Sequence, residues 1–400
     1  MTSNASDKLM KITIAVLLLS LSGRLFAGEW SGYSAVDYRY FFHQSPYEEP
    51  GQHDPAAVLA PEYYHAWDND NQSLIIAPFF RVDSQDSERT HVDLREFSWL
   101  KVADEWELKL GISKVYWGVT ESQHLVDIIN QTDQVENIDG EDKLGQPMIN
   151  LSFFKDWGAL DLFILPYFRE RTFPGVDGRL RSNPPVDTDS AVYESGAGQK
   201  HIDAAIRWSH SLGDWDLGLS HFYGTSRDPR FSADLISKDG FIPFYEIINQ
   251  TGLDVQMTHD SWLWKLEVIR RDSKQDTFTA STGGFEYTFY GVFSSDTDIG
   301  VIAEYLFDDR TNGLISPFEN DLMMGSRLTL NDEQSSELLL GIVQDLDSSD
   351  ASWNLEASRR IGDRWKLSLE ARFFKVGKPQ NPLYFVRDDD YIQLELARYF

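Results

Sequence analysis

Apolar and polar side chains alternate along much of the chain with a period of two residues. This period is typical of β-strands, because successive side chains of a strand point to opposite faces of the sheet. In 365–374, one face is made of apolar side chains: Trp365, Leu367, Leu369, Ala371 and Phe373. The opposite face is mostly polar: Lys366, Ser368, Glu370, Arg372 and Phe374. The same division recurs in 106–113 and 262–271, which predicts strands with one apolar and one polar face.

About eighteen segments show this alternation and have the length of strands. They are 30–42, 60–67, 72–82, 89–103, 105–116, 148–157, 159–168, 200–212, 214–224, 251–259, 262–271, 276–292, 297–308, 319–330, 334–346, 350–361, 363–376 and 389–400. A tilted strand of about 9–11 residues spans a bilayer, and most of these segments are that long. If two of them are not strands, the number is sixteen.

The connections between these segments alternate in length. When the connections are numbered from the N-terminus, the even-numbered ones include tight turns, such as 68–71, 213–214 and 362–363. Of those in odd positions, three are of intermediate length, two are tight (272–275 and 347–349), and four are long: 43–59, 117–147, 169–199 and 225–250. Transmembrane β-barrels have short periplasmic turns and longer outer loops in alternation. We therefore predict an all-β fold, a closed antiparallel transmembrane β-barrel of about 16–18 strands.

The composition favours a barrel over a bundle of transmembrane helices. Aromatic residues make up 14% of the chain, yet the mean hydropathy of −0.38 is too polar for a helical membrane protein. No stretch after Gly28 has the roughly 18 consecutive apolar residues of a transmembrane helix. The chain has no cysteine, so it forms neither a disulfide nor a cysteine-ligated metal site.

The N-terminus has the pattern of a secretory signal peptide. Lys8 and Lys11 flank the start of a short apolar run, 12–19, and the small residue Ala27 lies beyond it. We predict that 1–27 is a cleaved signal peptide and that 28–400 is an outer-membrane β-barrel.

The C-terminus ends on an aromatic residue, Phe400, which shares a face with Ile392, Leu394 and Leu396. This ending resembles the signal that the barrel-insertion machinery reads in Gram-negative bacteria. We therefore expect that machinery as a partner, and the lipid and lipopolysaccharide of the outer membrane as surroundings.

A barrel of this size encloses a lumen that water can fill, so charged residues on its inner face are tolerated. The predicted lumen-lining residues are charged members of the polar faces: Glu107, Lys109, Asp203, Arg207, Lys265, Glu267, Arg271, Glu356, Arg360, Lys366, Glu370 and Arg372. Two interpretations stay open. These residues pair with one another as a wall network, or a subset forms the narrow part that selects solutes.

The long connection 117–147 is the best candidate for a constriction. Loops longer than about 12–15 residues are usually functional or disordered, and this one has too many Ile, Val and Leu to be disordered. Leu125, Ile128 and Ile129 predict the apolar side of a short helix packed inside the wall. Residues 136–142 place carboxylates around a glycine, as a calcium site or as a solvated acidic turn, but the spacing differs from a twelve-residue calcium loop.

Two stretches carry a family resemblance. One joins 94–100, which begins Leu-Arg-Glu, to 111–118, which ends Trp-Gly. The other is 126–133, which contains the pattern Asp-x-x-Asn-x-x-Asp. Together they resemble a family of porin-like proteobacterial outer-membrane barrels of unknown function. Ser113 and Gln131 depart from that family's pattern, which has glutamine and proline at these positions.

The resemblance implies a porin-like barrel with one structured inner loop. It implies four members of that loop, which are our candidate pore-constriction residues: Trp117, Asp127, Asn130 and Asp133.

Charge and motifs exclude several function classes. The formal net charge of −28 makes nucleic acid a poor partner, because phosphate binding needs a basic surface. The nine histidines include no H-x-x-x-H or H-x-H pair of the kind that binds zinc, and no phosphate-binding loop is present. The stretches 208–211 and 221–226 lack the Asn-Gly that follows the catalytic serine of outer-membrane phospholipases. We predict no enzymatic activity, no cofactor and no metal.

These patterns favour a porin-like channel for passive passage of small solutes, with 117–147 as its constriction. One alternative is a barrel that binds or transports a hydrophobic ligand or lipid, in an apolar pocket lined by Phe163, Leu165, Tyr167 and the inner loop. Another is a scaffold of an envelope complex that docks partners through 169–199 and 225–250. The sequence carries no signal for an oligomeric state.

Overall fold

The computed structural model describes residues 28–47, 50–231, 236–237, 240–310, 316 and 318–400. The predicted signal peptide, 1–27, lies outside the described residues. No helix among the described residues is long and apolar enough to cross a membrane.

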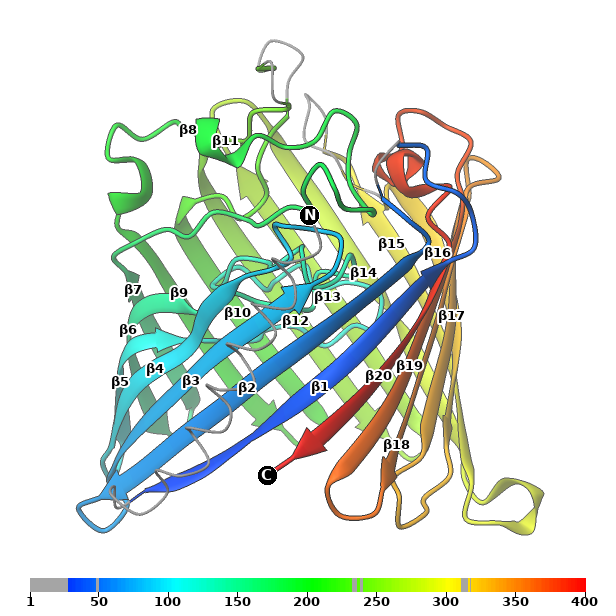
Figure 1. The fold of residues 1–400 in the computed structure, drawn as a ribbon. Coiled ribbons are helices and arrows are strands. Elements are labelled where there is room, and N and C mark those ends of the chain that lie inside the picture. The colour runs from blue at the N-terminus through cyan, green and yellow to red at the C-terminus, as the bar shows by residue number, and fades with distance from the viewer. Residues whose placement is uncertain (1–27, 48–49, 232–235, 238–239, 311–315, 317) are drawn as a thin grey trace.

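Eighteen antiparallel strands form one closed sheet (Figure 1). Closure is made by β1 and β20, which pair from Tyr33–Tyr399 to Phe41–Tyr391. The strands of the wall are β1 (Glu29–Phe41), β2 (His53–Trp67), β3 (Gln72–Asp83), β4 (Val92–Val102), β5 (Trp106–Ser113), β6 (Gln146–Lys155), β7 (Gly158–Leu165), β9 (Asp203–Leu212), β10 (Trp215–Thr225), β12 (Ile247–His259), β13 (Trp262–Asp272), β14 (Thr277–Phe289), β15 (Asp298–Asp308), β16 (Asn320–Thr329), β17 (Glu337–Asp345), β18 (Ala351–Ile361), β19 (Trp365–Lys375) and β20 (Tyr391–Tyr399).

All eighteen predicted segments are strands of this wall, so the antiparallel barrel is confirmed and the sixteen-strand alternative is excluded. The largest error in bounds concerns β2, predicted to begin at residue 60 but beginning at His53. Pro55 and Pro61 argued against a strand at this point of the sequence, because proline has no N–H to donate to a ladder. Pairing of β2 with β3 is interrupted between Leu59 and Tyr63, which accommodates Pro61, while pairing with β1 continues.

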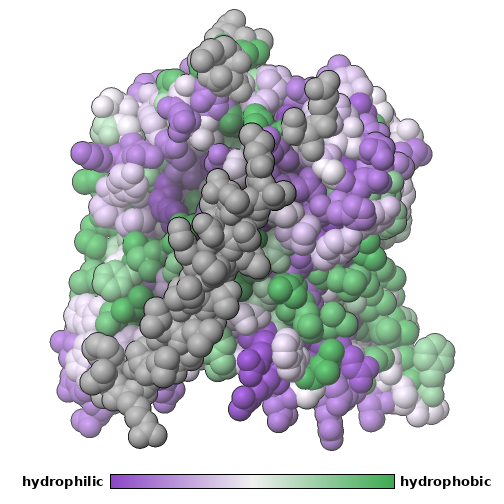
Figure 2. Space-filling view, in the orientation of Figure 1, coloured by the Kyte–Doolittle hydropathy of each residue, from purple (hydrophilic) through white to green (hydrophobic). Residues whose placement is uncertain are grey.

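The two faces of the wall differ as the alternation predicts. On β13, Trp262 and Trp264 are exposed on the outer face, while Lys265, Glu267 and Arg271 point inward and are largely buried. On the face drawn in Figure 2, hydrophobic residues gather in a band at mid-height, between more hydrophilic ends. This band is the surface that a bilayer would cover.

The long connections gather at one end of the barrel, at the top in Figure 1, and the short turns at the other. The first residues of β1 and the last of β20 lie at the short-turn end, where the Phe400 N–H donates to Gly32 O at 3.1 Å. Two long outer connections are joined by a small parallel sheet of β8 (Val192–Tyr193) and β11 (Phe244–Tyr245). The 3₁₀-helix η4 (Pro382–Val386) lies in the last outer connection.

Candidate pore and inner loop

The connection between β5 and β6, residues 114–145, is folded into the barrel, and we call it the inner loop. Asn130 fastens its two ends to the wall. The Val115 N–H donates to Asn130 Oδ1 at 2.8 Å. The Asn130 side-chain amide donates to Ser113 O at 2.9 Å and to Leu144 O at 2.8 Å. One side chain therefore fixes both the entry and the exit of the loop.

One side of the inner loop packs against an apolar part of the wall. Ile128 and Ile129 are fully buried in a cluster with Phe222 of β10 and Ile269 of β13, and Leu125 packs against this cluster. The predicted packing inside the wall is confirmed. The predicted short helix is wrong, since the described inner loop contains no helix. Its backbone donors instead bond to side chains of the wall, which competes with a helical ladder.

A buried carboxylate of β13, Glu267, holds the first part of the inner loop. Its Oε1 accepts hydrogen bonds from the Val119 N–H at 2.7 Å, the Thr120 N–H at 3.0 Å and the Thr120 hydroxyl at 2.8 Å. Its Oε2 accepts a fourth bond, from the Val126 N–H at 3.1 Å. A carboxylate buried among four donors is well satisfied, because hydrogen bonds to an ionised acceptor are stronger than neutral ones.

A second wall carboxylate, Glu304 of β15, holds the next residues. It accepts from the Glu121 N–H at 2.8 Å, the Ser122 N–H at 2.9 Å and the Ser122 hydroxyl at 2.7 Å. The Glu121 carboxylate lies 2.8 Å from Arg327 and 3.5 Å from Lys265. The loop is thus anchored to β13, β15 and β16 by a continuous polar network.

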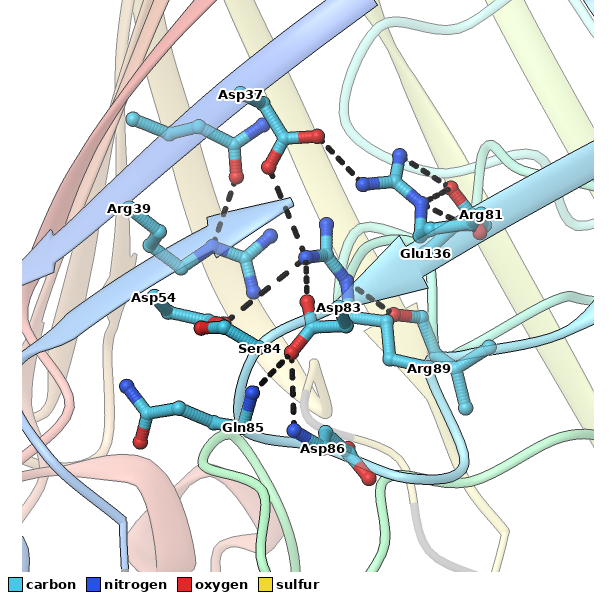
Figure 3. Close-up of polar contacts among 12 residues, drawn as sticks. Asp37, Arg39, Asp54, Arg81, Asp83, Ser84, Gln85, Asp86, Arg89 and Glu136 are labelled. Carbon is cyan, nitrogen blue, oxygen red and sulfur yellow. Dashed lines mark hydrogen bonds and ion pairs between the residues drawn. The ribbon is translucent and has the colours of Figure 1, made fainter. Parts of the chain in front are cut away.

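The strands on another side of the barrel hold the second half of the loop (Figure 3). Arg81 of β3 makes an ion pair of 2.7 Å with Glu136 of the loop and one of 2.5 Å with Asp37 of β1. Arg89 lies 2.6 Å from Asp83 and 3.7 Å from Asp37, which extends the network along the wall. These charges are almost completely buried, so their mutual pairing is what makes their burial tolerable.

The tip of the inner loop reaches β19. The Asn137 amide donates to Glu370 Oε2 at 3.0 Å. Arg372 Nη2 lies 2.8 Å from Asp139 Oδ2. The loop therefore crosses the lumen and is fixed on opposite sides of it, which is the geometry of a partition.

The acidic run 136–142 is distributed among cations. Glu136 and Asp139 pair with arginines, and Glu141 lies 3.4 Å from His124. Such pairing favours the structural interpretation of this run over a calcium site.

One group of described residues brings metal-ligating atoms within 4.8 Å of one another: His91, Asp133 and Glu136. Arg95 lies 2.6 Å from Asp133, and Arg81 lies 2.7 Å from Glu136. Both carboxylates are already neutralised by guanidinium groups, which a divalent cation would have to displace.

The four candidate constriction residues all lie in the inner loop, and their contacts are with the wall or within the loop itself. Trp117 is buried beside the wall, and Asn130 forms the stem contacts described above. Asp127 is buried 3.4 Å from Lys143, and Asp133 is held by an arginine of β4. None of the four lines either of the two cavities described below.

The predicted lumen-lining residues fall into three groups. One group lines a cavity on the open side of the inner loop: Glu356, Lys366, Glu370 and Arg372. A second lies on the wall covered by the loop and is tied into ion pairs or hydrogen bonds: Asp203, Arg207, Lys265, Glu267 and Arg271. The third lies elsewhere on the strands: Glu107 and Lys109, half-buried on β5, and Arg360, exposed on β18.

Two cavities flank the tip of the inner loop. The chamber, of about 760 Å³, lies between the loop and strands β16 to β20. The vestibule, of about 650 Å³, lies among the outer connections on the other side of the tip. Both are large enough for hydrated ions or small organic solutes.

The chamber has an acidic lining. Seven carboxylates line it: Glu121, Asp139, Glu141, Glu337, Glu356, Glu370 and Glu395. Its basic residues are fewer: Arg327, Lys366 and Arg372, together with His124. This excess of negative charge attracts cations and repels anions.

The vestibule combines aromatic side chains with charged groups. Phe173, Phe231 and Phe241 line it beside Arg171 and Asp228. The Asp228 carboxylate lies 2.8 Å from Arg171. Burial would raise the pKa of Asp228, but the nearby guanidinium groups hold that pKa well below its usual range.

The alternation pattern missed two important contacts of the loop. Glu304 stands between Ile302 and Leu306 on the inner face of β15, so this face looked as apolar as the outer one. A single carboxylate between buried apolar residues was the available signal. Arg81 and Asp83 alternate with apolar residues in the same way, and their two-residue spacing matched the lumen pattern.

No known protein-family model matches the chain, and no curated protein sequence matches it significantly. The family resemblance seen in 94–133 therefore stays a prediction.

Solved structures do match. One match is Wzi of Escherichia coli, which is described as an outer-membrane protein involved in group 1 capsule assembly and as a carbohydrate-binding β-barrel. It superposes with a TM-score of 0.54 at 9% sequence identity, and the match covers 99% of this chain and 89% of Wzi. Two engineered porins of Rh. blastica superpose with TM-scores of 0.45 at 10% identity, covering 93% of this chain and all of theirs. The likeness to Wzi shows the fold: the chain is a closed eighteen-strand barrel of the outer-membrane type.

Proposed function

We propose that this protein is a porin-like channel of the Gram-negative outer membrane, through which small hydrophilic solutes pass passively, with cations preferred over anions. The observation that carries the proposal is the acidic chamber between the inner loop and strands β16 to β20. A plug would fill the lumen, whereas this loop crosses it and leaves a polar cavity between itself and strands β16 to β20.

The proposed location rests on the apolar band of the outer face (Figure 2). Lipid and lipopolysaccharide would cover this band, and the barrel-insertion machinery would recognise the strand that ends in Phe400. Leu394, Leu396 and Phe400 are exposed on the outer face of that strand, where such recognition is sterically possible. The proposed activity is passage, with no catalysed reaction.

The test is single-channel recording of the refolded chain 28–400 in a planar bilayer, with reversal potentials measured in a salt gradient. We expect steady currents with a K⁺/Cl⁻ permeability ratio above one. Swelling of proteoliposomes in sugars of increasing size would measure the solute limit. A folded barrel with neither current nor swelling would overturn the proposal.

The ion preference should depend on pH through His124, which belongs to the inner loop and lines the chamber. Burial alone would lower the pKa of His124, but its contacts with Glu141 and Glu267 raise that pKa to about 10. His124 is therefore charged at neutral pH, and its ion pairs are complete below pH 6.5 and lost as the pH rises through about 10.

We accordingly expect His124→Gln to raise the K⁺/Cl⁻ permeability ratio at pH 7, because it removes a positive charge from the chamber. Above about pH 10 the variant and the wild type should agree. Lysine residues titrate in the same pH range, but they are the same in both proteins, so the difference between the two permeability ratios at each pH reports on His124. A difference between them that is constant from pH 7 to 11 would contradict the assignment.

A second candidate function is saccharide binding in the vestibule. Aromatic faces beside charged side chains suit the apolar and hydroxyl faces of a sugar, and Wzi, which shares the fold, is described as carbohydrate-binding. Block of the channel current by added oligosaccharides, abolished by Phe231→Ala, would support it. The absence of block at millimolar sugar would remove this candidate.

The hydrophobic-ligand alternative loses its predicted pocket. Phe163 and Leu165 are buried in contact with the inner loop, in a cluster that includes Trp117 and Ile128. The loop's own side chains fill the space that a ligand would need. The scaffold alternative keeps its surface, because the outer connections 169–199 and 225–250 supply residues to the rim of the vestibule.

A further inference from the structure

Three residues line both the chamber and the vestibule: Ile138, Asp139 and Leu383. A residue shared by two neighbouring cavities belongs to the partition between them. A solute that moves from the vestibule to the chamber must therefore pass these side chains. The partition lies between the tip of the inner loop and η4, which sits in the connection from β19 to β20.

The partition has an apolar half. Ile138 and Leu383 both pack against a buried cluster that includes Phe41 of β1, Val386 of η4 and Tyr391 of β20. The two side chains come from elements 245 positions apart in the chain, yet they share this one support. Each side chain is only partly buried, so part of its surface remains available to the cavities.

The partition also has an ionic half. Arg372 of β19 lies 2.8 Å from Asp139 of the loop, 2.8 Å from Glu370 and 3.3 Å from Glu356. Of these three pairs, only Arg372–Asp139 links the inner loop to the wall, because the two glutamates belong to the wall itself. The amide of Asn137 reinforces the link through Glu370. Breaking the Arg372–Asp139 pair would remove the loop's carboxylate from Arg372, which would keep its ion pairs with the two glutamates.

We infer that the limiting aperture of this channel, and its ion selectivity, are set by Ile138, Asp139 and Leu383, with Arg372 as the latch that holds the loop tip against the wall. This inference rests on the proposed channel function. It moves the constriction away from Trp117, Asp127, Asn130 and Asp133, which line neither cavity.

A matched pair of variants tests the ionic half. Asp139→Asn and Asp127→Asn each remove one carboxylate of the same loop that is paired with a cation, Arg372 or Lys143. Only Asp139 lines the cavities. We expect Asp139→Asn to lower the K⁺/Cl⁻ permeability ratio at least twofold, and Asp127→Asn to leave it unchanged. Equal shifts in both variants, or a shift in Asp127→Asn alone, would overturn the inference.

Cysteine chemistry tests the apolar half, because the natural chain has no cysteine. Ile138→Cys and Leu383→Cys would each be exposed to a bulky methanethiosulfonate reagent during recording. We expect the current to fall by more than half and to recover with dithiothreitol. Ser358→Cys, which lies on the far wall of the chamber, is the control and should lose much less current. Unchanged current after complete modification of Ile138→Cys, verified by mass, would overturn the inference.

The outcomes separate this inference from the channel proposal. If the wild type conducts and modification changes the current of neither Ile138→Cys nor Leu383→Cys, the aperture is contradicted and the channel proposal is not. A silent wild type overturns the proposal of an open channel, but current that appears only in the Ile138→Ala/Leu383→Ala double variant would still support the aperture, because it would place the barrier at these two side chains. Silence of both, in barrels shown to be folded by heat-dependent gel mobility, overturns the aperture together with the channel.

Discussion

A barrel without its inner loop will conduct several times more current than the wild type, and it will lose most of its preference for cations. The loop crosses the lumen, and it supplies three of the seven carboxylates of the chamber: Glu121, Asp139 and Glu141. Without it, the aperture becomes the full width of an eighteen-strand barrel, which is wide enough for an aqueous channel. The permeability ratio should then approach that of free solution.

The deletion can be made cleanly because Ser113 and Gln146 are direct partners in the β5–β6 ladder. Replacing 114–145 with an Asn-Gly turn would close these strands as a two-residue hairpin. Heat-dependent mobility on a gel verifies that the barrel is folded, since the deletion leaves apolar wall residues such as Phe222 and Ile269 facing water. A folded deletion variant with the conductance and selectivity of the wild type would show that the loop does not limit passage.

Substitution of Glu267 by Gln will release the loop without removing it. Glu267 accepts four hydrogen bonds from the loop, and an amide would turn a donor toward at least one of them. A buried donor left without an acceptor costs about 1–3 kcal/mol. A loss of about 2 kcal/mol changes the ratio of docked to undocked loop roughly 30-fold. We expect frequent transitions to a higher conductance level in single-channel records.

Glu337→Gln is the matched control for this variant. Glu337 is another carboxylate of the inner wall, one that lines the chamber, but it accepts a hydrogen bond from Ser358 of the neighbouring strand rather than from the loop. Glu337→Gln therefore also removes one negative charge, while the hydrogen bonds from the loop to Glu267 stay intact. If Glu267→Gln shows no transitions to a higher conductance level, or if both variants show them equally often, the carboxylate of Glu267 does not control the loop.

The barrel itself could be predicted because its signal is repeated in many strands. Where one face of a strand is apolar and the other is polar, a period of two results, as in 262–271 and 365–374. The one long error in bounds, at 53–59 of β2, arose beside Pro61, which lies where the β2–β3 ladder is interrupted between Leu59 and Tyr63. A single sequence cannot show that a neighbouring strand has stopped pairing there.

The site was harder to predict because its contacts join distant parts of the chain. The sequence indicated which loop enters the barrel, and Asp127, Asn130 and Asp133 are indeed part of it. It could not indicate which side of that loop meets the wall. Apolar spacing at Ile128 and Ile129 fits a helix as well as an irregular segment, and only the buried donors to Glu267 and Glu304 decide between them.

The anchors of the inner loop also have a consequence for how the molecule is made. Three of these contacts join residues far apart in the chain. The separation is 147 positions for Thr120 and Glu267, 182 for Ser122 and Glu304, and 233 for Asp139 and Arg372. Contacts of such separation form late, because the intervening chain must first be ordered. The loop therefore docks only after most of the wall has assembled. We therefore expect docking of the inner loop, which divides the lumen and leaves the chamber open, to be a late step of folding.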